Sequence, residues 1–289
     1  LFCWVMAIAQ KAPDNRFVKE NFIKKEVYIP MRDGVKLFTS IYIPKDISKA
    51  KKYPFLMQRT CYSVAPYGET EYKSSLGPNK YLMNEKYIFV YQDVRGRYMS
   101  EGTFTNMTPQ VERKTKKDVD ESTDTYDTID WLLKNITNNN GKVGQYGTSY
   151  PGFYTAAGIL ADHPALVASS PQAPISDFWN DDFLHNGKFM LGYFRTFPVF
   201  GVQKTKAEKE GWYMDSFIKP TSEDGLKFYR ELGTLKDGYE KYYKDNFFMT
   251  EIMNHPNYDE YWQKRSLLPH LKNVNHAVMT VGGWYDAED

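Results

Sequence analysis

Residues 141–158, GKVGQYGTSYPGFYTAAG, constrain the fold of this chain more than any other stretch. Residues 143–146 are typical of the end of a short buried strand, and residues 154–160 of the apolar body of a helix. A glycine-containing turn, 147–152, joins them and holds Ser149 at its apex. A strand that turns sharply into a helix with a serine at the apex is the geometry of a nucleophile elbow. We therefore expect the Ser149 hydroxyl to stand clear of the sheet, with the free N–H groups of the helix N-terminus behind it available to a developing oxyanion.

The match to the general elbow pattern G-x-S-x-G is imperfect. Pro151 takes the last position of the pattern, and Gly152 follows one residue later. An alternative interpretation is a glycine-rich turn that opens an ordinary helix, with Ser149 as the N-cap. This stretch alone leaves both interpretations open, so the rest of the chain has to decide between them.

Short apolar runs alternate with helical patterns along the first part of the chain. A hairpin is predicted within residues 25–44, where two strand-like runs flank an Asp-Gly pair. An apolar stripe predicts a helix over 123–136, with Ser122 or Thr123 as its N-cap. Further strands are predicted at 55–57, 87–91, 143–146, 165–169 and 277–281. This alternation predicts an α/β fold with a mainly parallel sheet that is covered on both faces.

The pattern changes after Pro174, where strand-like runs become rare and aromatic residues frequent. Helices are predicted over 226–232 and 239–253, so this part is expected to form a helical cap over the sheet. The predicted division of the chain is a residual signal peptide (1–9), the first part of an α/β core (10–177), a helical cap (178–265) and the resumed core (266–289).

The first nine residues, LFCWVMAIA, are apolar but too short to span a bilayer. Their A-I-A ending at Ala9 is similar to the end of a secretory signal peptide that lacks its first residues. The alternative is a buried N-terminal strand. Cleavage after Ala9 would leave Cys61 as the remaining cysteine of the two in the chain, without an intramolecular disulfide. We therefore expect a secreted or periplasmic protein.

The charge balance argues against two classes of partner. The chain has 37 Lys and Arg and 36 Asp and Glu, interspersed, for a net charge of +1. Such a balance favours neither a nucleic-acid partner nor, once a signal peptide is cleaved, a membrane partner. The sequence contains neither H-E-x-x-H, nor C-x-x-C, nor a glycine-rich phosphate-binding loop, so no metal and no cofactor are expected.

Several motifs, in the right order, resemble the peptidase S15 / cocaine-esterase-like (CocE/NonD-like) family of serine hydrolases. The family includes X-prolyl dipeptidyl peptidases, glutaryl-7-aminocephalosporanic-acid acylases and α-amino acid ester hydrolases. Its elbow is G-x-S-Y-x-G, which residues 147–152 match and which accounts for the displaced glycine. The other matching stretches are 31–37 (MRDGVKL), 59–62 (RTCY), 92–97 (QDVRGR) and 283–286 (GWYD). The resemblance runs from about Lys25 to the last residue and favours Ser149 as a nucleophile.

The resemblance implies an α/β-hydrolase fold with a helical cap insertion and assigns four catalytic positions. Ser149 is similar to the acylated nucleophile and Asp286 to the triad acid. The Tyr62 hydroxyl and the Tyr150 backbone N–H are similar to the two donors of the oxyanion hole, where charge builds up in the transition state.

The resemblance places the triad histidine after the acid, whereas all five histidines of this chain precede Asp286. None of them is assigned as the general base. The chain is therefore expected to be truncated at both ends, and to lack the histidine and the family's C-terminal jelly-roll domain. We expect the 289 residues by themselves to have little turnover, because a serine hydroxyl without a base is a weak nucleophile.

Within the family, the ending at 286–289 (DAED) and the segment 181–185 (DDFLH) resemble the α-amino acid ester hydrolases. The resemblance implies that Asp182, Glu288 and Asp289 hold the α-ammonium group of the substrate. Three carboxylates around one water-poor pocket would attract a cation strongly. The alternative is that these acids are exposed loop residues.

The predicted function is thus a secreted serine hydrolase that acts through an acyl-enzyme on small α-amino acid esters or amides. Acyl transfer to β-lactam nuclei and a homo-oligomeric full-length protein stay open. The alternatives are an X-prolyl dipeptidyl peptidase, a glutaryl-7-aminocephalosporanic-acid acylase, a general carboxylesterase, or a non-catalytic binding protein on a hydrolase scaffold. The carboxylates would repel an anionic glutaryl chain, whereas a dipeptidase also needs an ammonium site and is harder to exclude.

Overall fold

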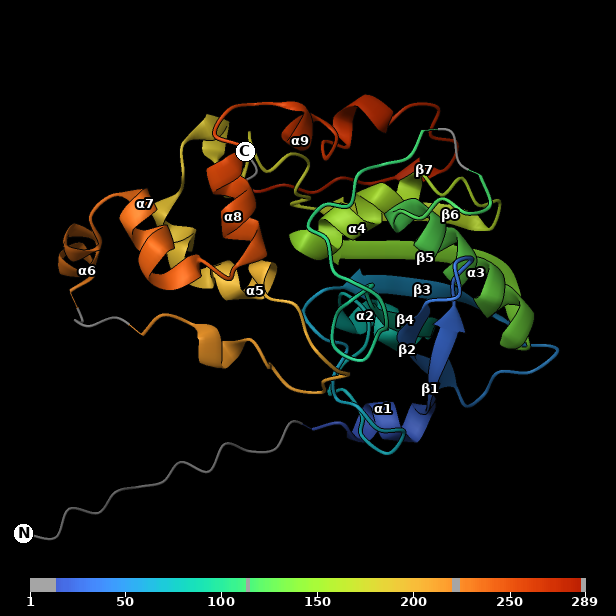
Figure 1. Cartoon of the computed structure of the whole chain (residues 1–289). Helices are drawn as coiled ribbons and strands as arrows, with labels where there is room; N and C mark the ends of the chain where they lie inside the picture. The colour runs from blue at the N-terminus through green and yellow to red at the C-terminus, as the bar shows by residue number, and fades with distance from the viewer. Residues whose placement is uncertain (1–13, 113–114, 220–223, 287–289) are drawn as a thin grey trace, which may run out of the picture.

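The computed structural model describes residues 14–112, 115–219 and 224–286. Within these ranges the chain forms one seven-stranded sheet with helices on both faces (Figure 1). The strands are β1 (Phe22–Pro30), β2 (Lys36–Pro44), β3 (Tyr53–Thr60), β4 (Ile88–Asp93), β5 (Asn139–Thr148), β6 (Leu166–Gln172) and β7 (Ala277–Val278). The α-helices are α1 (Arg16–Asn21), α2 (Lys80–Glu85), α3 (Glu121–Asn135), α4 (Tyr150–Ile159), α5 (Phe197–Gly201), α6 (Gly225–Leu232), α7 (Leu235–Gly238), α8 (Phe247–Asn254) and α9 (Glu260–Gln263).

The strands lie side by side in the order β1-β2-β4-β3-β5-β6-β7. β2 pairs antiparallel with both β1 and β4, and from β4 to β7 all neighbouring strands are parallel. The predicted hairpin is the β1–β2 pair, and the strands predicted at 55–57, 87–91, 143–146 and 165–169 lie in β3 to β6. The α/β fold with a mainly parallel sheet is therefore confirmed.

Both faces of the sheet are covered, which is why its strands are so apolar. On one face, Ile129 and Leu132 of α3 pack with Met57 of β3 and Val143 of β5. On this face α4 lies over β5 and β6. On the other face, Val18 of α1 belongs to a second buried cluster with aromatic side chains of β2 and β4.

The last strand is shorter than predicted. Regular pairing with β6 covers Ala277 and Val278 only, and then resumes as an isolated bridge between Gln172 and Val281. The Ala173 N–H donates to the Val281 carbonyl at 2.7 Å. The chain after β7 therefore runs along the end of β6, beside the turn that follows β5.

Helix α3 begins two residues earlier than predicted, and its N-cap is Asp120 instead of Ser122 or Thr123. The Asp120 carboxylate accepts from the Thr123 N–H at 2.8 Å, and the Thr123 hydroxyl accepts from the Asp120 N–H at 2.9 Å. Asp120 is 1% exposed, and its carboxylate is the acceptor for a free N–H at the start of the helix. The helix therefore begins after Asp120 and not after the Ser122 or Thr123 hydroxyl.

Between β6 and β7 the described residues form helices and no strand. Helix α6 lies where it is predicted, but the single helix predicted over 239–253 is wrong: a π-helical turn at Tyr239–Tyr243 is followed by α8. The break has a polar cause, because the Asn246 side chain caps α8 and also donates to the Phe197 carbonyl. The division into core and cap at 178–265 stays a prediction.

The predicted signal peptide at residues 1–9 lies outside the described residues. In the described part of the chain, no helix has the length and apolar character needed to cross a membrane.

Candidate active site

Ser149 stands at the turn between β5 and α4 in a backbone conformation that L-residues rarely adopt. Its φ is 63° and its ψ is −127°. Two backbone hydrogen bonds hold it there: the Ser149 N–H donates to the Gln172 carbonyl at 2.9 Å, and the Ser149 carbonyl accepts from the Phe153 N–H at 3.0 Å. Ser149 occupies the N-cap position, yet its hydroxyl makes no capping hydrogen bond. The interpretation of Ser149 as an ordinary helix cap therefore has no support in the geometry.

Close packing explains where the glycines of the turn lie. A Cβ atom at Gly147 would lie 2.1 Å from the Pro151 carbonyl oxygen, and one at Gly152 would lie 2.5 Å from the Gln172 carbonyl oxygen. Pro151 is tolerated because it lies in the first turn of α4, where a backbone N–H has no acceptor within the helix. The displaced glycine thus has a physical reason in this turn.

Tyr62 reaches this turn from the loop after β3. The residue as a whole is 38% exposed, and its phenol lies close enough to the Ser149 side chain for the two to interact. Burial of the hydroxyl raises the pKa of Tyr62, the negative potential of neighbours including Asp182 raises it further, and the interaction with Ser149 lowers it. The phenol therefore keeps its proton and can donate a hydrogen bond.

Tyr150, the first residue of α4, has its side chain locked in the core. Its hydroxyl accepts from the Met107 N–H at 2.9 Å and lies 3.1 Å from the Asn106 Oδ1. Burial raises the pKa of Tyr150 well above its usual value. Its backbone N–H, in the first turn of α4, is one of the groups for which a helix offers no internal acceptor. That N–H belongs to the residue directly after Ser149, whereas Tyr62 comes from the loop after β3.

Asp182 lies near this cluster and is 7% exposed. Its carboxylate Oδ1 accepts from the Tyr193 hydroxyl at 3.0 Å, and its φ of 50° marks a second unusual backbone position. Burial raises the pKa of Asp182 to about 6; the Tyr193 bond lowers it and the charge of Asp286 raises it. The charge of Asp182 thus acts on Tyr62, and the charge of Asp286 acts on Asp182.

The remaining carboxylates of the predicted ammonium site, Glu288 and Asp289, lie outside the described residues. Asp181, the neighbour of Asp182, has a different environment: its Oδ2 accepts from the Ser176 N–H and hydroxyl, both at 3.0 Å, and from the Asp177 N–H at 3.2 Å. Asp181 thus fixes the loop backbone, while Asp182 faces Tyr193.

None of the five histidines, all of which fall in the described ranges, is hydrogen-bonded to Ser149. His276 Nε2 lies 2.8 Å from the Ser169 hydroxyl, and His255 Nδ1 lies 2.7 Å from an Asp259 oxygen. Both of these histidines therefore have partners away from Ser149.

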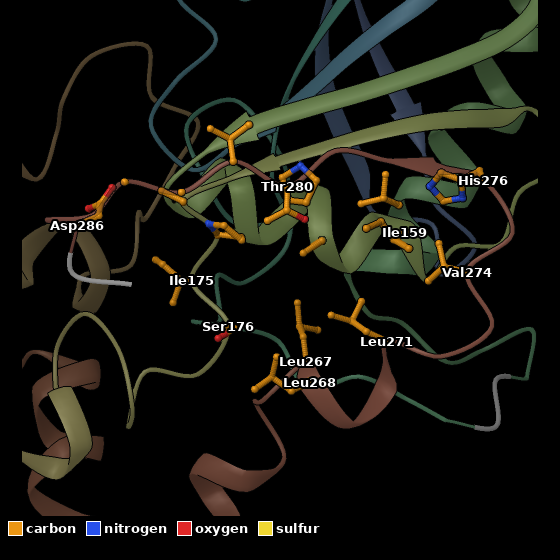
Figure 2. Close-up of a pocket in the computed structure, with 18 residues that line it drawn as sticks. Ile159, Ile175, Ser176, Leu267, Leu268, Leu271, Val274, His276, Thr280 and Asp286 are labelled. Atoms are coloured by element: carbon orange, nitrogen blue, oxygen red, sulfur yellow. The ribbon is translucent and has the colours of Figure 1, made fainter. Parts of the chain in front are cut away.

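A cavity adjoins this cluster at Asp286 without being lined by Ser149. It measures about 600 Å³ and lies between α4, the segment 267–274 and the chain around β7. Figure 2 shows apolar side chains such as Leu267, Leu271 and Val274 on its walls, with Asp286 at one end. Of the predicted site residues that the structure describes, Asp286 alone lines it. The described residues contain no group of three or more His, Cys, Asp or Glu side chains that could hold a metal ion.

Three residues beside this cluster were not identified from the sequence. Tyr193 bonds to Asp182, Asn106 bonds to Tyr150, and the Phe200 ring packs against Tyr62 and Tyr150. Tyr193 lies 11 residues from Asp182 and Asn106 lies 44 residues from Tyr150, so no short sequence motif joins these residues to their partners.

Comparison with known proteins identifies a family that matches this chain. Residues 33–289 match the family described as X-Pro dipeptidyl-peptidase (S15 family). A cocaine esterase of Rhodococcus sp. (strain MB1 Bresler) is 24% identical, over 91% of this chain and 44% of its own length.

Two solved structures share the fold at higher identity. An α-amino acid ester hydrolase is 30% identical with a TM-score of 0.78, covering 100% of this chain and 48% of the solved one. An aminopeptidase from a marine sediment archaeon, Thaumarchaeota archaeon, is 32% identical with a TM-score of 0.78, covering 96% and 45%. The chain therefore spans less than half the length of these relatives.

Proposed function

The chain belongs to the X-Pro dipeptidyl-peptidase (S15) family, and on this premise we propose that it is a serine hydrolase that cleaves esters or amides through an acyl-enzyme. The observation that carries the proposal is the Ser149 turn: a serine at φ 63° whose hydroxyl makes no capping hydrogen bond, with the Tyr62 phenol close to its side chain. Backbone strain of this kind persists where the surrounding structure enforces it, which is common at catalytic positions.

In the proposed reaction the Ser149 Oγ attacks the substrate carbonyl carbon while a general base takes its proton. The carbonyl oxygen becomes an oxyanion, which accepts hydrogen bonds from the Tyr62 hydroxyl and the Tyr150 N–H. Collapse of this intermediate breaks the bond to the leaving alcohol or amine, which receives the proton, and leaves an ester on Ser149. Water then attacks that ester in a second round of the same steps. Asp286 is proposed to orient the base and to stabilise its charged form.

The proposed substrates carry a free α-ammonium group, which Asp182 binds. Support comes from the environment of this carboxylate: it is buried, and its electrostatic partner Asp286 is also an acid. A buried carboxylate with a second acid nearby favours the arrival of a cation, which would stabilise the ionised form of Asp182. Glu288 and Asp289 are proposed to complete the ammonium site. The names of the two solved relatives, an α-amino acid ester hydrolase and an aminopeptidase, agree with this substrate class.

A second candidate, a general carboxylesterase, is favoured by the curated relatives that are named cocaine esterase and putative serine esterase. It shares the Ser149 chemistry and differs only in making no use of Asp182. An acyl-enzyme can also pass its acyl group to an amine in place of water, so transfer to β-lactam amines is proposed as a side reaction of either candidate.

The proposal is tested by the hydrolysis of a neutral p-nitrophenyl ester by the full-length protein. Ser149→Ala should reduce kcat by several orders of magnitude, because without the nucleophile only binding and the oxyanion donors remain. Ser170→Ala, a serine on the neighbouring strand β6, is the matched control and should retain the activity. Undiminished turnover in Ser149→Ala would rule the proposed function out.

A further inference from the structure

The Tyr62 ring packs against two aromatic side chains from different parts of the chain. It meets Tyr150 edge to face, with 6.4 Å between ring centroids and an interplanar angle of 88°. It meets Phe200 in the same way, at 6.4 Å and 79°. Phe200 in turn stacks on Tyr150, at 5.7 Å and 11°. Because Tyr62 is partly exposed, these two contacts do much to fix the direction in which its hydroxyl points.

One buried side chain holds both partners of Tyr62. The Asn106 Nδ2 donates to the Phe200 carbonyl at 2.7 Å, and the Asn106 Oδ1 accepts from the Tyr150 hydroxyl, 3.1 Å away. Asn106 is 2% exposed, so neither bond is replaced easily by water. The elbow and helix α5 are therefore tied together at the point where they contact Tyr62.

Further polar contacts hold the segment around α5 against the loop after β4. The Arg97 guanidinium donates to the Val199 carbonyl. The Gln203 amide exchanges two hydrogen bonds with the Phe104 backbone, at 2.6 and 3.2 Å. These bonds join side chains to main chain, so they fix the position of the α5 backbone and not only of single side chains.

The far side of α5 is fixed as well. The Asn246 amide donates to the Phe197 carbonyl at 3.0 Å. Gly201 allows this close approach, since a Cβ atom there would lie 1.7 Å from the Asn246 Oδ1. With both sides held, α5 presents the Phe200 ring to Tyr62 in one position.

We propose that Phe200 is a positioning residue of the oxyanion hole: it acts through Tyr62, whose hydroxyl it keeps directed at the developing oxyanion. The inference rests on the proposed role of Tyr62 as an oxyanion donor. A hydrogen bond weakens steeply as its angle departs from linear, and an oxyanion donor is worth about 100-fold to 1,000-fold in kcat. A looser Tyr62 ring should therefore lower kcat and leave KM almost unchanged.

The test is a double-mutant cycle on the full-length protein with a neutral p-nitrophenyl ester, which does not depend on Asp182. Phe200→Leu should lower kcat by about tenfold or more, a part of the full effect of losing a donor. Tyr62→Phe should lower it further. The double variant should be no slower than Tyr62→Phe alone, because Phe200 has nothing left to position.

Phe194→Leu is the matched control. Phe194 belongs to the buried core, as Phe200 does, and its ring contacts are with Phe189, Tyr242 and Tyr243 instead of Tyr62. It should lower the melting temperature without lowering kcat. If Phe200→Leu does not fold, Phe200→Met, which keeps most of the apolar volume, takes its place with the same expectation.

Each adverse result has its own meaning. Fully additive effects of the Tyr62 and Phe200 substitutions, or a Phe194→Leu variant as slow as Phe200→Leu, would overturn the positioning role. A Tyr62→Phe variant with normal kcat would overturn it by removing its basis, while the hydrolase proposal would stand. Activity that survives Ser149→Ala would instead defeat the proposed function itself.

Discussion

At the scale of single residues, the proposed substrate class depends on Asp182. Burial raises the pKa of Asp182 to about 6, so the environment of this carboxylate resists its charged form. A bound ammonium group would remove that resistance, whereas an apolar group in the same place would leave it. A charged contact of this kind is worth on the order of 2–5 kcal/mol.

The first prediction concerns the choice between phenylglycine methyl ester and its des-amino analogue, methyl phenylacetate. Near neutral pH the ratio of their kcat/KM values should be roughly 30-fold or more in favour of the amine, since about 1.4 kcal/mol is tenfold. The ratio should fall as the pH is lowered through about 6, where Asp182 takes up a proton and loses its charge. It should also fall as the pH rises through the pKa of the substrate amine. Using the ratio cancels titrations, such as that of the base, that affect both esters alike.

The variants for this prediction are two neighbouring acids. Asp182→Asn should bring the ratio close to one and abolish its acid limb, with activity on the neutral ester retained. Asp181→Asn is the control, because the pKa of Asp181 is also raised to about 6 by burial while its carboxylate binds loop backbone. Equal rates for the two esters in the unmodified protein would show that Asp182 binds no ammonium, and would favour the general carboxylesterase.

At the scale of elements, the turn from β5 to α4 depends on two glycines, because a residue with a Cβ atom would not fit at either position. Gly147 and Gly152 leave room for backbone carbonyl groups that a methyl group would displace. The two glycines of the pattern G-x-S-Y-P-G thus allow two close backbone contacts, one with Pro151 and one with Gln172. This element was predictable because its constraints are local in the sequence.

The second prediction is that Gly147→Ala destabilises the protein. A Cβ atom 2.1 Å from a backbone oxygen requires the turn to shift, and overpacking of this kind costs about 1–3 kcal/mol or more. Gly192→Ala is the control, because no heavy atom lies within 4 Å of a Cβ built there. The measurement is the free energy of unfolding from denaturant titration. A Gly147→Ala variant as stable as Gly192→Ala would contradict the packing described for the turn.

The third prediction concerns the start of α3. Asp120→Ala should lower the free energy of unfolding by about 2 kcal/mol, the upper end for an N-cap, because this carboxylate is buried and also accepts from the Val111 N–H at 3.0 Å. Asp224→Ala, at the exposed start of α6, should have the smaller effect. The reverse order would contradict the assignment of Asp120 as the cap that matters.

Other elements show where the sequence falls short. The strands and most of α3 follow from hydrophobic runs and periodicity, which are local. The cap of α3 at Asp120 and the break before α8 depend on how polar side chains choose among several acceptors, and that choice is made only in the folded chain. Asn246, for example, caps α8 and holds α5 at once.

At the scale of the whole molecule, the residues of the candidate site come from segments that are far apart in the sequence. The sheet supplies Ser149 and Tyr62, the segment after β6 supplies Asp182, and the chain after β7 supplies Asp286. Each of these residues could be predicted from a motif, because each follows a strand or begins a segment with a local sequence pattern. Tyr193 and Phe200 were not predicted, since their roles depend on contacts with residues outside any such motif.

The central claim, that Ser149 is the acylated nucleophile, is tested most directly by finding where a covalent serine probe attaches. The full-length protein is treated with a fluorophosphonate, digested, and its modified peptide sequenced by mass spectrometry. We predict a single phosphonylated serine at Ser149, with no labelling in Ser149→Ala and normal labelling in Ser170→Ala. Labelling that persists in Ser149→Ala, or a modified residue elsewhere, would contradict the account.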